Sequence, residues 1–347
     1  MKPRLRPASN RLVLSSAAKA GLVLVALVLA TTSGCKQPSR SEIRCETADA
    51  LQQQSDDMRS LREVDPSLVK YEQIDVIETG LQEPRGIAVQ GGPHPALYVV
   101  GDRRLRVFDD TGFCGYDHQF PEAVYAMALA DDGCSYIGFR KRIAAYNYRP
   151  QLQSQWTLPG EDAYLTCLAV SGAEVWAADA GNRMVLHYTK SGELLGKIGE
   201  PDESSDTAQF IVPSPHFDVL LKGEDELLIT NPGRRRVETY NKDGELQSYW
   251  GKAAQNLAGF CGCCNPTDIA VLPDGRVVTA EKGLPRVKVY SPDGKFDCVV
   301  ATPDDFSARA VGLDLAVSAD GRVFVLEPAA AVVHVFAEKT QKGAEQG

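Results

Sequence analysis

Short apolar runs recur along the chain at nearly regular intervals. The central apolar residues of six such runs are 40 to 52 positions apart in the sequence. Each run is soon followed by a turn with Gly or Asp, which is typical of β-strands joined by tight hairpins. The six runs are RGIAV (85–89), YAMAL (125–129), TCLAV (166–170), HFDVL (216–220), TDIAV (267–271) and LDLAV (313–317).

Each run opens a unit in which the strands follow the same order. A second apolar strand comes after the turn, and a third strand ends in an aromatic residue. These aromatic residues are Phe108, Tyr146, Tyr188, Tyr240, Tyr290 and Phe336. Units of about 45 residues with four short strands are typical of β-propeller blades. We therefore predict an all-β fold in which six four-stranded antiparallel blades close into a ring.

The last unit lacks an outer strand, because only a polar tail (340–347) follows VVHVFAEK (332–339). The segment YEQIDVIETG (71–80), which precedes the first blade, has the pattern of a strand and can supply the missing one. We predict that it pairs with the last blade and closes the ring, which removes open sheet edges. The predicted propeller domain therefore spans 71–339.

One arginine stands at the same place in four of the units. It lies four residues before the aromatic residue that ends the third strand, as Arg104, Arg142, Arg236 and Arg286. A repeated column of this kind fits a structural role, because arginine forms strong bidentate pairs with carboxylates. We predict that these arginines pair with carboxylates of neighbouring blades.

Two of the units read DAGNRMVLHYTKSGE (179–193) and KGLPRVKVYSPDGKF (282–296). These sequences resemble the NHL-repeat family of six-bladed β-propellers, over about residues 71–339. The motif FCGCCNP (260–266) followed by EKG (281–283) resembles one blade of a subgroup of bacterial NHL-type lipoproteins. By position, this resemblance points to Cys263, Cys264, Asn265, Pro266, Glu281, Lys282, Gly283 and Arg286.

The N-terminal segment (1–34) is predicted to be a signal peptide. Its first 20 residues contain five basic residues and no acidic one, and the apolar run GLVLVALVLA (21–30) follows. Such a run is typical of an export signal and is too short to span a bilayer. TSGC (32–35) resembles a lipobox, which implies that Cys35 is acylated and anchors the protein in the outer membrane or periplasm. The alternative is a plain secretory signal.

A tether (35–70) connects this anchor to the propeller. Residues 41–66 contain many helix formers, with Ser41 as a possible cap and Pro66 as a stop, and we predict a spacer helix there.

The charge of the chain limits the class of partner. The whole sequence has 37 Lys and Arg against 46 Asp and Glu. Without the five basic residues of the signal, 32 basic residues remain against 46 acidic ones, a net charge of −14. Nucleic acid would be repelled by such a protein unless one face were strongly basic. We expect a monomer that does not bind nucleic acid.

One face is nevertheless predicted to be rich in arginine. In such blades, the loops between second and third strands and the connections between blades emerge on one side of the ring, called here the top face. Arginine suits bidentate contacts with carboxylate or phosphate groups, so we predict that this face binds a small anionic ligand or an acidic protein partner. The residues predicted to do so are Cys263, Cys264, Asn265, Glu281, Lys282, Arg286, Arg234, Arg235, Arg183, Arg103 and His216. An ordinary solvated surface is the alternative.

Cys261, Cys263 and Cys264 lie within four residues, in the connection that enters the fifth blade. Three interpretations stay open. The thiols could form disulfides locally or with Cys45, since an exported protein is in an oxidising compartment. A strained disulfide could join the adjacent Cys263 and Cys264. Alternatively, three thiolates could bind Cu(I) or Zn(II), which makes a metal or redox protein the alternative function. The sequence identifies no required cofactor.

An enzyme on the same scaffold is a second alternative. Peptidyl-amidoglycolate lyases share the NHL propeller and bind zinc with several histidines, but here only His216 is well placed. His216 or Glu281 could instead complete a metal site at the cysteines. Calcium-dependent lactonases need acidic ligands at the top of the channel, and Glu83, Asp268 and Asp314 lie near such positions. No Ser–His–Asp pairing, phosphate-binding loop or HExxH motif is present, and no catalytic residue is predicted.

Overall fold

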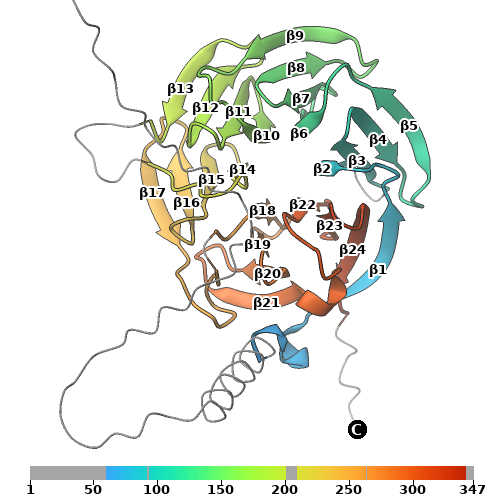
Figure 1. Cartoon of the computed structure of the whole chain (residues 1–347), viewed down its shortest axis with the longest axis vertical. Coiled ribbons are helices and arrows are strands. Elements are labelled where there is room, and N and C mark those ends of the chain that lie inside the picture. The colour runs from blue at the N-terminus through green and yellow to red at the C-terminus, as the bar shows by residue number, and fades with distance from the viewer. Residues whose placement is uncertain (1–59, 92–93, 201–208, 263, 341–347) are drawn as a thin grey trace, which may run out of the picture. The chain divides into compact units, whose positions relative to one another are not determined.

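A computed structural model describes residues 60–91, 94–200, 209–262 and 264–340 of the chain. Within the compact unit Gln54–Gly347, six four-stranded antiparallel sheets surround a common centre (Figure 1). The chain is therefore an all-β, six-bladed propeller, as the repeat pattern predicts.

Each blade runs from an inner strand at the channel to an outer strand at the edge. Blade 1 consists of β2 (Pro84–Gln90), β3 (Ala96–Gly101), β4 (Arg104–Phe108) and β5 (Cys114–Gln119). Blade 2 consists of β6 (Val124–Leu129), β7 (Ser135–Phe139), β8 (Arg142–Tyr146) and β9 (Leu152–Thr157). Blade 3 consists of β10 (Leu165–Ser171), β11 (Glu174–Asp179), β12 (Met184–Thr189) and β13 (Leu194–Ile198).

The other three blades follow in chain order. Blade 4 consists of β14 (Val219–Lys222), β15 (Glu226–Asn231), β16 (Arg236–Asn241) and β17 (Leu246–Trp250). Blade 5 consists of β18 (Asp268–Val271), β19 (Val277–Glu281), β20 (Arg286–Tyr290) and β21 (Phe296–Ala301). Blade 6 consists of β22 (Asp314–Val317), β23 (Val323–Glu327), β24 (Val332–Glu338) and β1 (Tyr71–Glu78). Two short 3-10 helices, η1 (Pro66–Leu68) and η2 (Pro303–Asp305), lie outside the blades.

Blade 6 closes the ring with strands from both ends of the propeller. β1 pairs antiparallel with β24, from Tyr71 opposite Glu338 to Glu78 opposite Val332. Blade 5 is tied to the same segment, because the backbone N–H of Lys70 donates to the carbonyl of Val299 at 3.1 Å. The predicted closure by residues 71–80 is thus confirmed.

The hydrophobic core is divided into layers between blades. Each buried apolar cluster draws its members mainly from two consecutive blades, as where Val287 and Val289 of blade 5 pack with Val323 and Val325 of blade 6. In the described part of the chain, similar clusters join each of the remaining pairs of neighbouring blades. Because one sheet cannot bury both faces alone, the blades depend on each other for burial of apolar surface.

The inner strand of blade 4 is shorter than the pattern predicts. The apolar run HFDVL (216–220) predicts a strand, but β14 begins only at Val219. The backbone N–H of Asp218 donates instead to the hydroxyl of Thr230, at 2.9 Å. The backbone N–H of Thr230 still donates to the carbonyl of Asp218 at 3.0 Å, so a side chain replaces one of the two bonds of this pair. The regular ladder begins at Val219 and leaves His216 and Phe217 in the connection above the strand.

The four repeated arginines form ion pairs with carboxylates that are near them in the chain. The pairs are Arg104–Asp117 at 3.4 Å, Arg142–Glu122 at 2.5 Å, Arg236–Glu238 at 2.6 Å and Arg286–Glu281 at 2.8 Å. Each partner lies in the same blade or in the connection that enters it, so the prediction of partners in neighbouring blades is wrong. The reason is distance, because strands in one sheet are ~4.8 Å apart, whereas packed sheets are ~10 Å apart with apolar side chains between them. A carboxylate in the same blade is therefore nearer to the arginine than one in the next blade.

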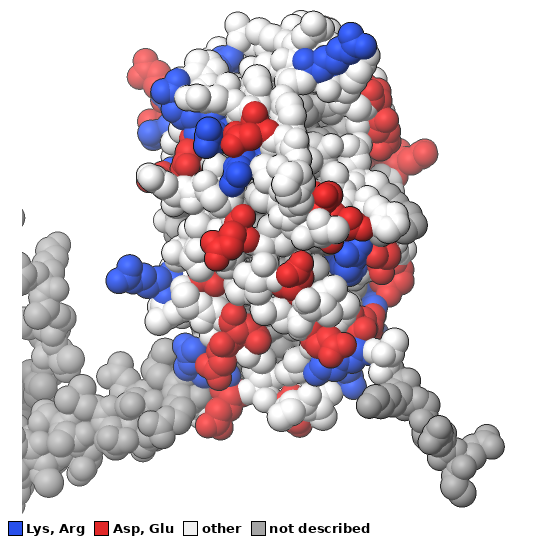
Figure 2. All heavy atoms as spheres, turned by 90° about the vertical axis from the view of Figure 1, so that its right-hand side faces the viewer, with Lys and Arg blue, Asp and Glu red and all other residues white. Residues whose placement is uncertain are grey.

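Several predictions fall outside the described residues. These are the signal peptide (1–34), the acylated Cys35, most of the tether helix (41–66), and most of the polar tail (340–347). Among the helices that the structure does describe, none has the length and apolarity needed to cross a membrane. The side of the propeller seen in Figure 2 carries basic and acidic side chains intermixed.

Arg276 is predicted to stabilise the closure of the ring. Its guanidinium lies 2.7 Å from Asp274 and 2.9 Å from Asp297 in blade 5, and 2.9 Å from Glu338 on β24 of blade 6. A network of several charges contributes more than an isolated surface pair. The Arg276→Met variant should therefore lose about 1–2 kcal/mol of unfolding free energy in chemical denaturation.

Arg322→Met is the matched control for this measurement. The Arg322 side chain is 21% exposed, as is that of Arg276, but its ion pair within the described residues is with Asp320, two positions away. We expect this control to lose less than about 0.5 kcal/mol. Equal losses in the two variants would contradict a role of Arg276 in closure.

Candidate functional site

The six inner strands surround a central channel that widens into a cavity at the top face. The channel cavity, of about 360 Å³, is lined by residues of all six inner strands. Above it lies a second cavity of about 420 Å³, called here the mouth cavity, to which connections and strand ends from every blade contribute. Ligand sites in proteins commonly have volumes of roughly 300–1,000 Å³, so the mouth cavity is large enough for a small ligand.

Three carboxyl groups line the channel cavity, and two of them, Asp268 and Asp314, also line the mouth cavity. They come from the start of the inner strands of blades 4, 5 and 6, and each accepts a backbone N–H from the inner strand of the next blade. The bonds are Ile269 N to Asp218 at 2.8 Å, Leu315 N to Asp268 at 3.0 Å and Ile87 N to Asp314 at 2.7 Å. The same strand position holds Gly86, Ala126 and Cys167 in blades 1, 2 and 3. One half of the channel is therefore acidic and the other half is not.

Burial raises the pKa of all three carboxyls. It raises the pKa of Asp314 to about 7, and the pKa of Asp218 rises for the same reason. Burial also raises the pKa of Asp268, with a further contribution from the charges of Asp218 and Asp314. Like charges in a small, poorly solvated space cannot all ionise freely, so the three groups share fewer than three charges near neutral pH.

Arg85, Tyr125 and Tyr164 line the opposite wall of the mouth cavity, and Arg140 lies behind Tyr164, outside the residues that line it. Arg85 lies over the ring of Tyr125 at 4.4 Å, and Tyr125 meets Tyr164 edge to face, with ring centroids 5.5 Å apart. Arg140 in turn lies over Tyr164 at 4.9 Å. Arg85 also pairs with exposed Glu83, but its Nε is buried without a hydrogen-bond partner. We call these four residues, Arg85, Tyr125, Tyr164 and Arg140, the Arg–Tyr stack.

His216 occupies the side of the mouth that belongs to blade 4. Burial, together with the nearby Lys282 cation, lowers its pKa to about 4, so the ring is neutral at neutral pH. A Cβ added to Gly312 would lie 2.5 Å from Cε1 of His216, so glycine at that position makes room for the ring. Lys282 itself donates to the hydroxyl of Ser214 at 2.6 Å, which links blade 5 to the connection that carries His216.

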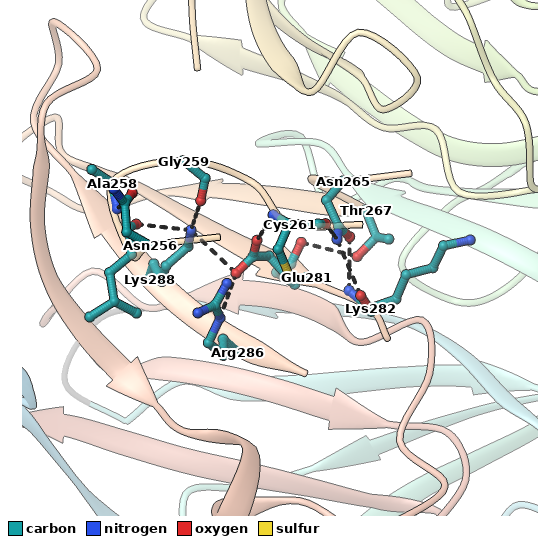
Figure 3. Close-up of polar contacts among 12 residues, drawn as sticks. Asn256, Ala258, Gly259, Cys261, Asn265, Thr267, Glu281, Lys282, Arg286 and Lys288 are labelled. Atoms are coloured by element: carbon teal, nitrogen blue, oxygen red, sulfur yellow. Dashed lines mark hydrogen bonds and ion pairs between the residues drawn. The ribbon is translucent and has the colours of Figure 1, made fainter. Parts of the chain in front are cut away.

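The cysteine-rich connection lies beside the mouth and is held from below by a buried ionic cluster (Figure 3). The backbone N–H of Cys261 donates to Glu281 at 3.2 Å. The other carboxylate oxygen of Glu281 lies 2.8 Å from Arg286 and 3.2 Å from Lys288. All three charged side chains are at most 1% exposed. Breaking such a buried network would leave an unpaired charge, so it fixes the connection firmly in place.

Lys288 completes this cluster by binding the backbone before the cysteines. Its ammonium donates to the carbonyls of Leu257 at 3.2 Å and Gly259 at 2.7 Å, and it lies over the rings of Phe260 and Tyr290. Burial lowers the pKa of Lys288 to about 8. Burial also raises the pKa of the Cys261 thiol, with a contribution from the Glu281 charge, which does not favour a reactive thiolate.

Asn265 connects this segment to the top loop of the same blade. Its side-chain amide donates to the carbonyls of Cys261 and Lys282, and its oxygen accepts the backbone N–H of Lys282 at 2.8 Å (Figure 3). Cys264 and Asn265 are buried. The predicted contact between the cysteine-rich connection and the EKG loop is therefore present, but Asn265, Glu281 and Arg286 bond to the protein itself.

The predicted arginines do not gather in one place. Arg235, on the neighbouring blade, donates to the carbonyl of Gly262 at 2.6 Å and so belongs with the cysteine-rich connection. Arg103 donates to the carbonyl of Phe120 and lines a separate surface groove between blades 1 and 2. Arg183 is exposed on its own loop, and Nε of Arg234 is buried without a partner.

Five of the described cysteines form no disulfide, and the described side chains contain no cluster arranged for a metal ion. Cys114, Cys134, Cys167, Cys261 and Cys298 take part in no disulfide within the described part of the chain. Within the described residues, no three His, Cys, Asp or Glu side chains are arranged to hold a metal ion. Cys45 and Cys263 lie outside those residues, so the metal or redox alternative stays a prediction.

The sequence did not single out Arg85, Tyr125, Tyr164 or Lys288. A weak signal for two of them was available, because Arg85 and Tyr125 occupy the position that holds Thr166, Phe217, Thr267 and Leu313 in the other inner strands. The contact of Glu281 with the entering connection is repeated in other blades. In five blades, a carboxylate or amide at the end of the second strand accepts a backbone N–H of the connection that enters the blade. These residues are Asp102, Asp179, Asn231, Glu281 and Glu327.

Comparison with known proteins supports the fold. No protein-family profile and no curated protein sequence matches the chain. Among solved structures, the WD40 β-propeller domain of Doa1 is similar with a TM-score of 0.52 at 9% identity, over 80% of this chain and 99% of that one. A catalytically inactive virginiamycin B lyase from Staphylococcus aureus, solved with quinupristin, has a TM-score of 0.52 at 10% identity, over 77% of this chain and 99% of that one. At such low identity, the likeness shows a shared β-propeller fold and says nothing about activity.

The raised pKa of Asp314 predicts how stability depends on pH. The folded protein keeps this proton up to about pH 7, whereas an unfolded aspartate loses it near pH 4. The stability that the group contributes is therefore complete below about pH 4 and is lost as the pH rises to about 7. Asp314→Asn keeps an oxygen for the Ile87 N–H and removes this titration. Across that window, the variant should gain at least about 1 kcal/mol relative to wild type in chemical denaturation.

The comparison with wild type is needed because His216 titrates in the opposite sense. Its pKa is lowered, so its contribution to stability rises with pH over part of the same window. That contribution is common to both proteins and cancels in the difference. A difference between wild type and Asp314→Asn that stays constant with pH would contradict the assignment.

Proposed function

We propose that the mouth cavity binds the anionic group of a small ligand or of an acidic segment of a partner protein, in a protein held at a membrane surface by lipid on Cys35. The observation that carries this proposal is the Arg–Tyr stack at the wall of a cavity of about 420 Å³. A ligand with a carboxylate or phosphate group would meet guanidinium donors there that the protein does not fully use.

The stack has the properties of a prepared anion site. Arginine stacked on an aromatic ring is held flat, so less conformational entropy is lost when its N–H groups bind a ligand. Arg85 is only partly exposed, and its Nε has no protein partner, so a ligand oxygen would satisfy a buried donor. Arg140 does not line the cavity, but it is exposed beside Tyr164, where a larger acidic partner could contact it.

The cysteine-rich connection supports this site from behind. Through Asn265 it fixes the backbone of Lys282, and the Lys282 ammonium holds Ser214 beside His216 at the mouth. The buried pair Glu281–Arg286 anchors the connection and has little surface to offer a ligand. In this proposal, Lys282 and His216 face the ligand, whereas Glu281 and Arg286 position the loop.

Binding of two anionic probes tests the proposal. A fluorescein-labelled oligo-aspartate peptide represents an acidic partner, and 4-methylbenzoate represents a small anion. At least one should bind the purified propeller, measured by fluorescence anisotropy or calorimetry. The variant Arg85→Ala/Arg140→Ala should weaken that binding about tenfold or more, because two charge-assisted contacts are lost.

Arg149→Ala is the matched control. Arg149 also lies over a tyrosine ring, that of Tyr148, but in the turn between β8 and β9 on the opposite face. The control should bind both probes as wild type does. Loss of binding in the control, or no difference between wild type and the double variant, would contradict a site at the Arg–Tyr stack.

The membrane anchor is tested separately. Full-length protein expressed in a bacterium that processes lipoproteins should incorporate an alkyne-labelled fatty acid and sediment with membranes. Cys35→Ser should lose the label and move to the soluble fraction, because the apolar run 21–30 would no longer lead to acylation. Label that persists in Cys35→Ser would exclude acylation at this residue, and Cys45→Ser serves as the control.

A further inference from the structure

The polar groups around the mouth cavity are separated by charge. The Arg–Tyr stack belongs to blades 1, 2 and 3, and its cations lie on one side. Asp268 and Asp314, which belong to blades 5 and 6, line the same cavity on the other side. The cavity therefore presents two chemically different ends to whatever occupies it.

The carboxyl end lacks a counter-charge of its own. Asp218, Asp268 and Asp314 take part in none of the ion pairs found among the described residues, although Asp218 is only 4% exposed. Among the other buried carboxylates of the described residues, Glu238 pairs with Arg236 and Glu281 with Arg286, whereas Asp179 has no ion pair and accepts several N–H donors instead. Proteins rarely keep several buried acidic groups together without a cation or a proton to compensate them.

The arginine end lacks hydrogen-bond acceptors for some of its N–H groups. Glu83, which also lines the mouth cavity, pairs with Arg85 at 2.8 Å and partly offsets its charge, but it leaves the buried Nε of Arg85 without an acceptor. Arg140 has no ion pair among the described residues and is exposed at the rim. A ligand with free acceptor oxygens would supply a further acceptor to Arg85, the arginine that lines the cavity.

From these two ends we infer that the ligand of the mouth cavity is amphoteric, with a carboxylate at the Arg–Tyr stack and an ammonium or guanidinium group at Asp268 and Asp314. Amino acids, short peptides and other amino carboxylates belong to this class. The two tyrosine rings beside the arginines, which also line the cavity, offer an aromatic surface for the body of the ligand. This inference rests on the proposed function, because it requires the anion site, and it adds the cation site and the ligand class.

Three probes of matched shape separate the two ends. 4-(Aminomethyl)benzoate carries both charges, benzylamine carries only the cation, and 4-methylbenzoate carries only the anion. In calorimetric titrations of the whole propeller, 4-(aminomethyl)benzoate should bind about tenfold or more tightly than either control. Its advantage over 4-methylbenzoate should grow as the pH rises through about 7, where Asp314 ionises.

Variants should remove one end at a time. Asp268→Asn keeps an oxygen for the Leu315 N–H, and it should erase most of the advantage of 4-(aminomethyl)benzoate while leaving the affinity for 4-methylbenzoate unchanged. Arg85→Gln should weaken both carboxylates and leave benzylamine unchanged. If Asp268→Asn fails to fold, as judged by circular dichroism, the pH dependence of the wild-type protein decides.

The outcomes distinguish this inference from the proposed function. Equal affinities for 4-(aminomethyl)benzoate and 4-methylbenzoate at every pH would overturn the amphoteric ligand and leave the anion site standing. If none of the three probes binds at millimolar concentration, the inference is overturned as well. The oligo-aspartate titration then decides by itself whether the anion site exists.

Discussion

The pairing of β1 with β24 is the constraint on which the rest of the structure depends. It joins residues more than 250 positions apart in the sequence, from Tyr71 opposite Glu338 to Glu78 opposite Val332. Only a closed ring brings blade 6 against blade 1, so that Asp314 can accept the N–H of Ile87. Without it, the apolar layer between these two blades would be open, and the channel and its mouth cavity would have no wall on that side. Contacts of such high sequence separation form at a large entropic cost, which the bonds of the closing strand and the network of Arg276 help to offset.

A second device holds the top loops once the ring is closed. A carboxylate or amide at the end of the second strand captures a backbone N–H of the entering connection in five blades, and Glu281 is the example in blade 5. In blade 5, Arg286 and Lys288 also pair with Glu281, which gives a buried ionic cluster beside the cysteine-rich connection. Because buried charges are costly unless fully paired, the positions of these side chains are fixed by each other. Function at the mouth then rests on loops with little freedom to move.

The mouth combines an acidic half, whose carboxyls have no ion pair among the described residues, with a half in which Glu83 offsets only part of the arginine charge. Carboxyls from blades 4 to 6 lie in and below the mouth cavity, and their pKa values are raised mainly by burial. The residues of the Arg–Tyr stack come from blades 1 to 3. Elsewhere the chain pairs its arginines locally, as in the four repeated ion pairs within single blades. The contrast between local pairing there and unpaired charge at the mouth is the physical basis for assigning a ligand to this cavity.

The sequence by itself determined the six units, the order of strands within them and the closing role of residues 71–80, because period, turn chemistry and terminal aromatics are local properties repeated along the chain. It also placed Cys261 and Glu281 together, since both belong to the top side of one blade. Only the tertiary structure decided which arginines are buried in ion pairs and which line the mouth cavity. Arg286 is buried against Glu281, whereas Arg85, which no motif singles out, stacks on Tyr125 of the next blade. The partners of a long charged side chain depend on neighbours from other blades and on the water excluded between them, and neither is recorded in the spacing of residues along one chain.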